Sequence, residues 1–114
     1  MAGASQGFHE DESRLSSRTR DLHRAIVSLQ EELEAIDWYQ QRADATEDPE
    51  LREILEHNRD EEKEHAMMLL EWLRRKDVVI ARMMKLHTGR SGPIVSAEEE
   101  AEASGEGRAE KGER

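Results

Sequence analysis

The stretch T-E-D-P at residues 46–49 decides the fold, because it separates two long helical segments. Asp48 is favoured immediately before a helix, since its carboxylate can accept hydrogen bonds from the first free backbone amides. Pro49 suits the first helical position, where an N–H would have no partner anyway. The following Glu50 complements the positive end of the new helix. The stretch therefore predicts a turn between a helix that ends near Ala45 and a second helix that begins at Pro49.

The segments on both sides of this turn have the apolar periodicity of amphipathic helices. The first helix is predicted over roughly residues 13–45 and the second over residues 49 to about 76. Their apolar residues recur at spacings of three, four and seven, which places them on one face of each helix. These residues are Leu22, Ala25, Ile26, Leu29, Leu33, Ile36 and Tyr39 in the first helix, and Leu51, Leu55, Leu69, Trp72 and Leu73 in the second. The pattern predicts an all-α antiparallel two-helix hairpin.

The C-terminal part of the chain predicts one further short helix. Asp77 can cap a helix over residues 78–86, although continuation of the second helix through Asp77 is an alternative. Gly89 and the pair Gly92-Pro93 end helical structure, and the chain from Ser96 onward carries no large apolar residue. The predicted organisation is a flexible N-terminus over residues 1–12, the hairpin with its short third helix over residues 13–88, and a disordered acidic tail over residues 89–114.

The composition favours helices that complete their core against a partner chain. Of the 114 residues, 39% are charged and 35% are hydrophobic, and the mean hydropathy is −0.95. A single domain this small and polar would have a thin core. The net charge of −10 argues against binding to nucleic acid, which needs clustered Lys and Arg.

The same composition excludes other classes of protein. The chain has no cysteine, which excludes disulfides and cysteine-ligated zinc or iron–sulfur clusters and permits a cytoplasmic location. No apolar run approaches the length of a membrane span, and residues 1–12 lack the apolar core of a signal peptide.

Three polar residues interrupt the apolar stripes. Glu32 lies in the first stripe, and the Glu-x-x-His pair Glu62 and His65 lies in the second, within roughly 45° of its centre. An unpaired carboxylate at such a position would be costly. Glu32 and Glu62 are also equidistant from Glu47, so an antiparallel hairpin that turns there brings them to the same height. We therefore expect Glu32, Glu62 and His65 to meet at one site.

These residue types are half of a two-metal site. Four-helix bundles that bind two iron atoms use a Glu from each of two helices and a Glu-x-x-His from each of the other two. Carboxylate oxygens and imidazole together suit iron and permit redox change. A second copy of the chain would supply the other half. Two alternatives are a non-catalytic oligomerisation module, in which the three residues fix the register of the dimer, and a di-iron carboxylate oxidoreductase that acts on an organic substrate.

Other residues are candidates for supporting roles. Glu31, Glu34 and Trp38 share another face of the first helix, which is either solvated or a cation-collecting site that takes calcium or another divalent ion. Tyr39 is either an interface aromatic residue or a hydrogen-bond partner of a ligand carboxylate.

The sequence resembles the encapsulated ferritins over roughly residues 20–95. The similar segments are HRAIVS at 23–28, EELEA at 31–35, DWY at 37–39, DPEL at 48–51, HNRDEEKEHA at 57–66 and LEWLRR at 70–75. The resemblance implies a hairpin that dimerises about a two-fold axis into a ferritin-like four-helix bundle, with a di-iron ferroxidase centre at the interface. It also implies that five dimers form a decamer, which oxidises Fe(II) to Fe(III) and supplies iron for storage in a surrounding encapsulin nanocompartment.

The resemblance also implies roles for individual residues. Glu32, Glu62 and His65 match the ferroxidase ligands, and Tyr39 matches a residue near that centre. The acidic face of Glu31, Glu34 and Trp38 matches a site through which metal reaches the centre. Family members carry a C-terminal encapsulin-targeting peptide, typically a Gly-Ser-Leu-Arg-like segment with apolar residues, and residues 105–114 show no such segment. A location inside the nanocompartment is expected where the full-length protein carries that peptide.

Overall fold

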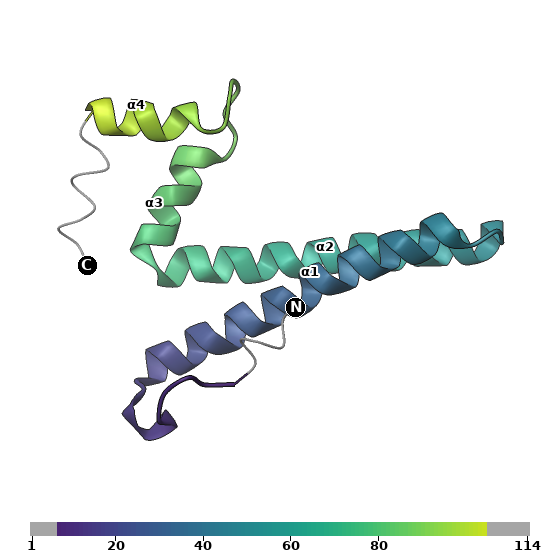
Figure 1. The fold of residues 1–114 in the computed structure, drawn as a ribbon, viewed down its shortest axis with the longest axis horizontal. Coiled ribbons are helices and arrows are strands. Elements are labelled where there is room, and N and C mark those ends of the chain that lie inside the picture. Colours follow the sequence, from purple (N-terminus) through teal and green to yellow (C-terminus); the bar gives the residue numbers. More distant parts are fainter. Residues whose placement is uncertain (1–6, 105–114) are drawn as a thin grey trace. The chain divides into compact units, whose positions relative to one another are not determined.

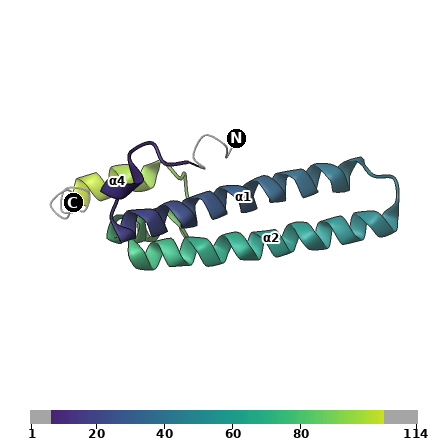
Figure 2. The ribbon, with the colours of Figure 1, turned by 90° about the horizontal axis from the view of Figure 1, so that it is seen from below.

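The computed structural model describes residues 7–104, and within them every regular element is a helix. These elements are a 3-10 turn η2 (Glu12–Arg14) and the helices α1 (Ser17–Ala45), α2 (Pro49–Lys76), α3 (Val78–His87) and α4 (Ser96–Ser104). Figures 1 and 2 show α1 and α2 as an antiparallel pair joined by a short turn. The predicted all-α hairpin with a short third helix is confirmed.

The turn between α1 and α2 forms as the sequence predicts. Asp48 Oδ1 accepts hydrogen bonds from the backbone amides of Glu50 (2.9 Å) and Leu51 (3.3 Å), which caps α2. The side chain of Arg52 reaches back and donates to the carbonyl oxygens of Ala43 (2.9 Å) and Thr46. Arg52 thereby satisfies carbonyl groups that the end of α1 leaves without helical partners.

The first helix begins four residues later than the sequence predicts. Residues 12–14 form the separate turn η2, and Ser16 caps α1 by accepting a hydrogen bond from the amide of Thr19 (3.1 Å). The apolar periodicity does not reveal this boundary, because it follows from the local competition between the Ser16 hydroxyl and the helical hydrogen bonds.

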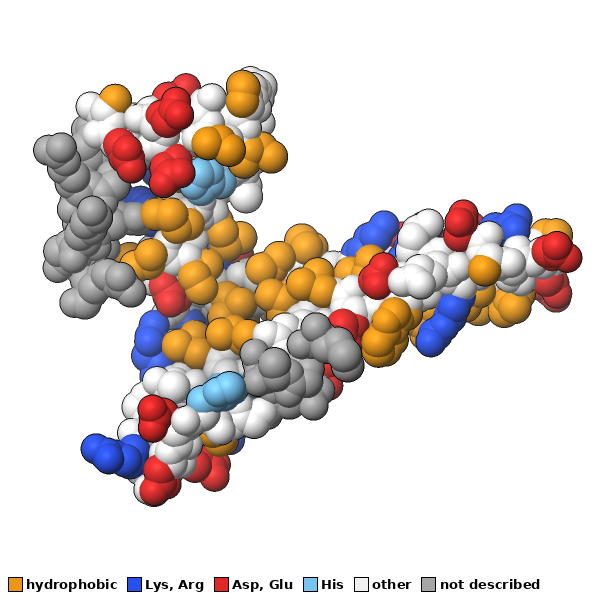
Figure 3. Space-filling model, in the orientation of Figure 1, with side chains coloured by type: hydrophobic (Ala, Val, Ile, Leu, Met, Phe, Trp, Pro, Cys, Tyr) orange, Lys and Arg blue, Asp and Glu red, His pale blue; other side chains and the backbone are white. Residues whose placement is uncertain are grey.

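The hairpin has a core made mostly of small side chains. Its buried apolar residues are Ala25, Ala43 and Ala66, with Leu73 toward the end of α2, and no large side chain of the described residues is completely buried. Several apolar residues of the predicted stripes stay partly exposed, namely Ile26, Leu33 and Leu51, and so do the neighbouring residues Ile54, Met67 and Met68. Figure 3 shows hydrophobic side chains gathered along the hairpin. A single chain therefore buries only part of the apolar surface of the two helices.

The chain divides into two units, residues 1–72 and residues 73–114. In the second unit, Asp77 caps α3 by accepting hydrogen bonds from the amides of Val79 (2.9 Å) and Ile80 (3.0 Å). This cap confirms a separate third helix rather than a continuation of α2. Gly89 then adopts a φ of +70°, which an L side chain rarely adopts, and ends helical structure.

Helix α4 corrects the prediction of a disordered tail from residue 89. Residues 96–104 form a helix beside α3, with Ala97 only 5% exposed and an ion pair between Arg90 and Glu100. The prediction relied on the lack of large apolar residues, but alanine and glutamate have high helix propensity. Glu98 and Glu99 also lie in the first turn, where negative charge is favourable. Residues 105–114 lie outside the described residues, as do residues 1–6 of the predicted flexible N-terminus.

None of the helices in the described part of the chain combines the length and the apolar character needed to cross a membrane.

Candidate metal centre

The hairpin brings Glu32 of α1 together with Glu62 and His65 of α2. One ligand atom from each residue lies within 4.8 Å of the other two, a spacing that could hold a metal ion. His65 Nδ1 is 3.6 Å from Glu32 Oε2 and 3.5 Å from Glu62 Oε2. We refer to these three residues as the triad. This convergence agrees with the expectation from the sequence that Glu32 and Glu62, which are equally far from the turn, lie at the same height in an antiparallel hairpin.

The helical period explains why the triad converges. Glu62 and His65 are three residues apart on α2, which makes them neighbours on one helix face. That face carries the apolar stripe toward α1, where Glu32 interrupts the opposite stripe. The side chains are only partly covered in a single chain: His65 is 43% exposed, Glu32 24% and Glu62 23%. The triad therefore lies at an open edge of the hairpin rather than in a closed cavity.

One oxygen of Glu32 lacks a hydrogen-bond partner. Its Oε2 is buried and accepts no hydrogen bond from the described residues. The 3.6 Å separation from His65 Nδ1 is too long for one. A buried acceptor without a donor costs free energy, so native proteins seldom leave one unsatisfied. A cation bound between the two carboxylates would supply the missing interaction, and the donor set of two carboxylates and one imidazole fits a divalent transition metal.

The triad is too small to hold two metal ions alone. It provides one carboxylate from one helix and a Glu-x-x-His from the other, which is half of the set used by di-iron bundles. The open edge leaves room for a symmetric copy of the same three residues.

The structure does not bring Tyr39 to the triad within one chain. Tyr39 lies seven residues after Glu32 on α1, which is about 10 Å along the helix axis. Its half-buried ring instead lies beneath the guanidinium of Arg42, with 5.6 Å between the Cζ atom and the ring centroid. A role for Tyr39 near the metal remains a prediction that requires a second chain.

The acidic face of α1 is exposed and does not form a ligand group in one chain. Glu31 is exposed, Glu34 is half-buried, and the Trp38 side chain is 50% exposed. Among the residues that the structure describes, Glu31 and Glu34 belong to no group of three ligand-type side chains. Calcium at this face therefore has no support.

The other histidines of α1 and α2 lie outside the triad. His57 is strongly exposed and its Nε2 lies 3.5 Å from Glu61. His23 packs against Phe8, with 4.5 Å between the ring centroids. The Phe8–His23 contact could not be predicted from the sequence, because no periodic pattern relates the segment before α1 to the helix.

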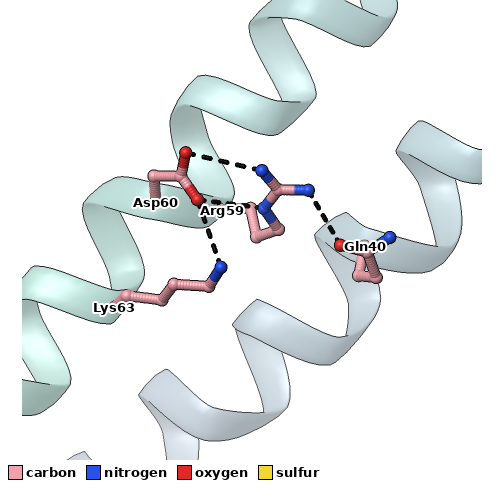
Figure 4. Close-up of polar contacts among 4 residues, drawn as sticks. All are labelled: Gln40, Arg59, Asp60 and Lys63. Carbon is pink, nitrogen blue, oxygen red and sulfur yellow. Dashed lines mark hydrogen bonds and ion pairs between the residues drawn. The ribbon is translucent and has the colours of Figure 1, made fainter.

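A second polar cluster joins α1 and α2, and it was not apparent from the sequence. Figure 4 shows Arg59, Asp60 and Lys63 of α2 beside Gln40 of α1. The pKa of the Asp60 carboxyl is lowered, chiefly by its hydrogen bond from Arg59 and then by that from Lys63. The same hydrogen bond to Asp60 raises the pKa of Arg59. The run from Arg59 to Glu64 reads as surface charge in the sequence, and only the fold shows that Arg59 reaches α1.

Comparison with known proteins gives a consistent set of relatives. The EncFtn-like family model matches residues 7–89. An encapsulated ferritin-like protein of Rhodospirillum rubrum is 55% identical over 107 residues, which cover 94% of this chain and 76% of that protein. A ferritin-like protein of Thermotoga maritima is 48% identical over 99 residues, which cover 87% of each chain.

Two further comparisons concern a cargo protein and a solved structure. The encapsulin nanocompartment cargo protein EncC of Myxococcus xanthus is 40% identical over 58 residues, which cover 50% of this chain and 45% of that protein. The crystal structure of protein ne0167 from Nitrosomonas europaea is similar with a TM-score of 0.75 at 56% sequence identity. The similarity covers 77% of this chain and 97% of that one.

Proposed function

The chain belongs to the EncFtn-like family of encapsulated ferritin-like proteins, and from this premise we propose that it is a ferroxidase. It oxidises Fe(II) to Fe(III) at a di-iron centre that two copies of the chain build across a two-fold axis. Iron is the substrate, O2 is the electron acceptor, and Glu32, Glu62 and His65 of each copy are the ligands.

The observation that carries this proposal is the convergence of the triad around an unsatisfied carboxylate oxygen. Glu32, Glu62 and His65 offer three ligand atoms within 4.8 Å of one another, and Glu32 Oε2 is buried without a hydrogen bond. A two-fold axis beside the triad would duplicate it, which gives four carboxylates and two imidazoles for two metal ions.

The chemistry of the ligands suits iron oxidation. Carboxylates are hard, anionic ligands that stabilise Fe(III) more than Fe(II), because they offset the additional charge. Imidazole binds both Fe(II) and Fe(III). The small number of protein ligands leaves coordination positions open for O2. Each of two adjacent Fe(II) ions gives up one electron, so a pair can transfer two electrons to one O2. The protein contributes ligands at fixed positions and a partly shielded interface.

The exposed apolar surface of the hairpin supports the two-fold partner. Ile26 and Leu33 of α1 are 42% and 52% exposed, and Met67 and Met68 of α2 are 56% and 59% exposed. Monomeric proteins rarely leave contiguous apolar surface of this kind uncovered. A second hairpin would cover it and complete a four-helix bundle.

We further propose that five such dimers form a decamer. In this assembly, Tyr39 approaches the centre, and the face of Glu31, Glu34 and Trp38 collects Fe(II).

The names of the relatives support a location inside a protein shell. The Rhodospirillum rubrum relative is described as encapsulated, and the Myxococcus xanthus relative as an encapsulin nanocompartment cargo protein. We propose that this protein is likewise a cargo of an encapsulin shell, to which it delivers Fe(III) for storage. Co-expression with the shell protein, followed by purification of intact shells, would show whether the chain is retained inside.

The activity test compares the triad with matched neighbours on the same helix. Fe(II) is mixed with O2-saturated buffer, and Fe(III) formation is followed by absorbance for Glu62→Gln and His65→Ala. The controls are Glu64→Gln and His57→Ala, which change the same residue types at exposed positions of α2. We expect the triad variants to lose more than about tenfold in rate, since even outer-shell changes at metal sites commonly cost 10–100-fold. The control variants should keep the rate of the unaltered protein.

Equal rates in all four variants would reject the triad as the oxidation site. Absence of stoichiometric iron in the protein after aerobic loading would instead favour the non-catalytic oligomerisation module.

A further inference from the structure

The polar cluster of Gln40, Arg59, Asp60 and Lys63 contains a side-chain hydrogen bond between α1 and α2. Arg59 Nη1 donates to Gln40 Oε1 at 2.8 Å (Figure 4). The other edge of the guanidinium donates to Asp60, with Nε 3.0 Å from Oδ1 and Nη2 3.4 Å from Oδ2. Lys63 Nζ lies 3.3 Å from the same Oδ1. The Arg59 side chain is only 17% exposed, whereas Gln40 is exposed, so Arg59 lies along the hairpin and its contact with Gln40 lies at the outer edge of the two helices.

The apolar core does little to determine how α1 and α2 align. Most of the buried apolar residues of the hairpin are alanines (Ala25, Ala43 and Ala66), whose single methyl groups present nearly flat surfaces, and the larger buried side chain of Leu73 lies toward the C-terminal end of α2. Interlocking of large side chains normally determines the alignment of two helices. Where that interlocking is weak, directional polar contacts can specify the register, as buried polar residues do in coiled coils.

The triad is sensitive to small errors in this alignment. A displacement of one helix by one residue moves a side chain by about 1.5 Å along the axis and rotates it by about 100°. The ligand atoms of the triad lie within 4.8 Å of one another. A slip of one residue would therefore turn Glu62 or His65 away from Glu32.

Arg59 is well placed to prevent such a slip. It precedes Glu62 by three residues, so the two side chains are neighbours on α2. We propose that Arg59 is a positioning residue for the metal centre, which holds Gln40 and thereby fixes the register at which Glu32 meets Glu62 and His65. The role of the register in metal binding rests on the proposed function, whereas the register itself does not.

Asp60 and Lys63 explain why an arginine is needed here. Asp60 holds one edge of the planar guanidinium, which leaves Nη1 directed at Gln40. A lysine has a single ammonium group without this fork and cannot make both contacts in the same geometry. Arg52 also reaches α1, but it binds the carbonyl oxygens of Ala43 and Thr46 at the turn, where the short connection already restricts the alignment.

The first experiment measures metal affinity without oxidation. Binding of Co(II) is titrated by absorbance and calorimetry for Arg59→Gln, Arg59→Lys, Gln40→Ala and the double variant Arg59→Gln/Gln40→Ala. We expect each single variant to bind Co(II) about three- to tenfold more weakly, the fold-change that corresponds to the net contribution of one hydrogen bond. The double variant should lose no more than either single variant, because both remove the same contact.

Two further variants provide the control and the rescue. Arg24→Gln breaks an exposed pair with Asp21 that lies within α1, and it should leave Co(II) affinity unchanged. Gln40→Glu gives Arg59 a charged acceptor, which makes the hydrogen bond stronger, and should retain full affinity. Full affinity in Arg59→Gln, or additive losses in the double variant, would overturn the proposal.

The second experiment measures the register with no metal present. Because the chain has no cysteine, nitroxide labels can be attached through Asp44→Cys on α1 and Glu64→Cys on α2, with labelled chains diluted into unlabelled protein. The distance distribution should be narrow with Arg59 and should broaden or shift in Arg59→Gln. An unchanged distribution would overturn the positioning role. If the unaltered protein bound no Co(II), the proposed function would fail while this measurement would still decide the role of Arg59.

Discussion

Glu32 is the residue whose surroundings most directly indicate a cation site. Its Oε2 is buried without a hydrogen bond, and the Glu62 carboxylate belongs to the same cluster. Two carboxylates that share a site repel each other, and a buried acceptor without a donor costs further free energy. In the absence of metal, the triad is therefore a local source of instability.

Glu32→Gln should therefore stabilise the metal-free protein while it abolishes metal binding. The amide has the shape of the carboxylate, removes one negative charge and can donate a hydrogen bond to Glu62. We expect the free energy of unfolding to rise by about 1 kcal/mol in urea titrations with a chelator present. Glu31→Gln, at the exposed neighbouring position, is the control and should change little. A loss of stability in Glu32→Gln would argue that the carboxylate has a structural partner even without metal.

For individual residues, the sequence predicted that the triad would converge, but it did not predict the contact between Arg59 and Gln40. Helical periodicity and distance from the turn are enough to bring Glu32, Glu62 and His65 together, because both depend only on regular backbone geometry. The contact between Arg59 and Gln40 depends on the conformations of two long side chains across a helix interface. No spacing rule determines those conformations, so the contact became apparent only in the structure.

The starts of α2 and α3, each marked by a capping aspartate, are the helix boundaries that the sequence predicted most accurately. Asp48 and Asp77 each accept hydrogen bonds from backbone amides of the helix that follows. These signals are local, so they do not depend on how the chain packs. The boundary at Ser16 and the helix α4 were predicted wrongly, because neither is marked by an apolar stripe. In α4 the absence of large apolar residues outweighed the high helix propensity of its alanines and glutamates.

The Asp77 cap gives a test that is specific to one helix. Asp77→Ala removes the acceptor for the amides of Val79 and Ile80, which should destabilise α3 by about 1 kcal/mol. Asp77→Asn keeps an acceptor oxygen and should cost much less. Amide hydrogen exchange resolved by residue should show faster exchange in α3 for the alanine variant. Equal protection of α3 in both variants would show that packing alone holds this helix.

The Arg59–Asp60 pair of α2 gives a pH-dependent prediction. The hydrogen bond from Arg59, followed by that from Lys63, lowers the pKa of Asp60 below its ordinary value of 3.8. A lowered pKa in the folded state means that the stabilisation by Asp60 is complete above pH ~4 and is lost as the pH falls through the folded-state pKa.

The difference in urea midpoint between the unaltered protein and Asp60→Asn should therefore be largest near neutral pH. It should shrink as the pH falls below ~4 and through the lowered folded-state pKa of Asp60, beyond which both proteins carry a neutral side chain at this position. The same comparison with Asp21→Asn provides a control, because Asp21 forms an exposed pair with Arg24 within one helix. A midpoint difference that does not vary with pH would show that the Asp60 charge adds nothing to stability.

At the scale of the whole molecule, the proposed shared site predicts that metal promotes assembly. Each copy supplies half of the ligands, so bound metal stabilises the dimer and any larger assembly relative to the single chain by mass action. Native mass spectrometry of protein prepared with a chelator should show smaller species than the same protein with Fe(II) or Co(II). Glu62→Gln should remove most of this dependence. An identical distribution of species with and without metal would place the site within a single chain.

The sequence also anticipated that a single hairpin buries little apolar surface. A mean hydropathy of −0.95 and two amphipathic stripes already indicated that one hairpin could not bury much apolar surface. The sequence could not indicate which residues would be buried, because that depends on the crossing of α1 and α2. The structure shows that alanines and Leu73 are buried, while Ile26, Leu33, Met67 and Met68 remain partly exposed.

The alanine core of the hairpin has a consequence for the life of the protein in the cell. A newly made chain that has met no other copy has little to hold its helices together and displays the surfaces that chaperones and proteases recognise. If two hairpins pair as proposed, its survival depends on how soon it finds a second copy, and that time shortens as the chain is synthesised faster. Low synthesis would then yield mostly degraded chains, whereas synthesis above a threshold would yield long-lived protein. The proposed pairing would thus link the lifetime of each chain to the abundance of its own kind.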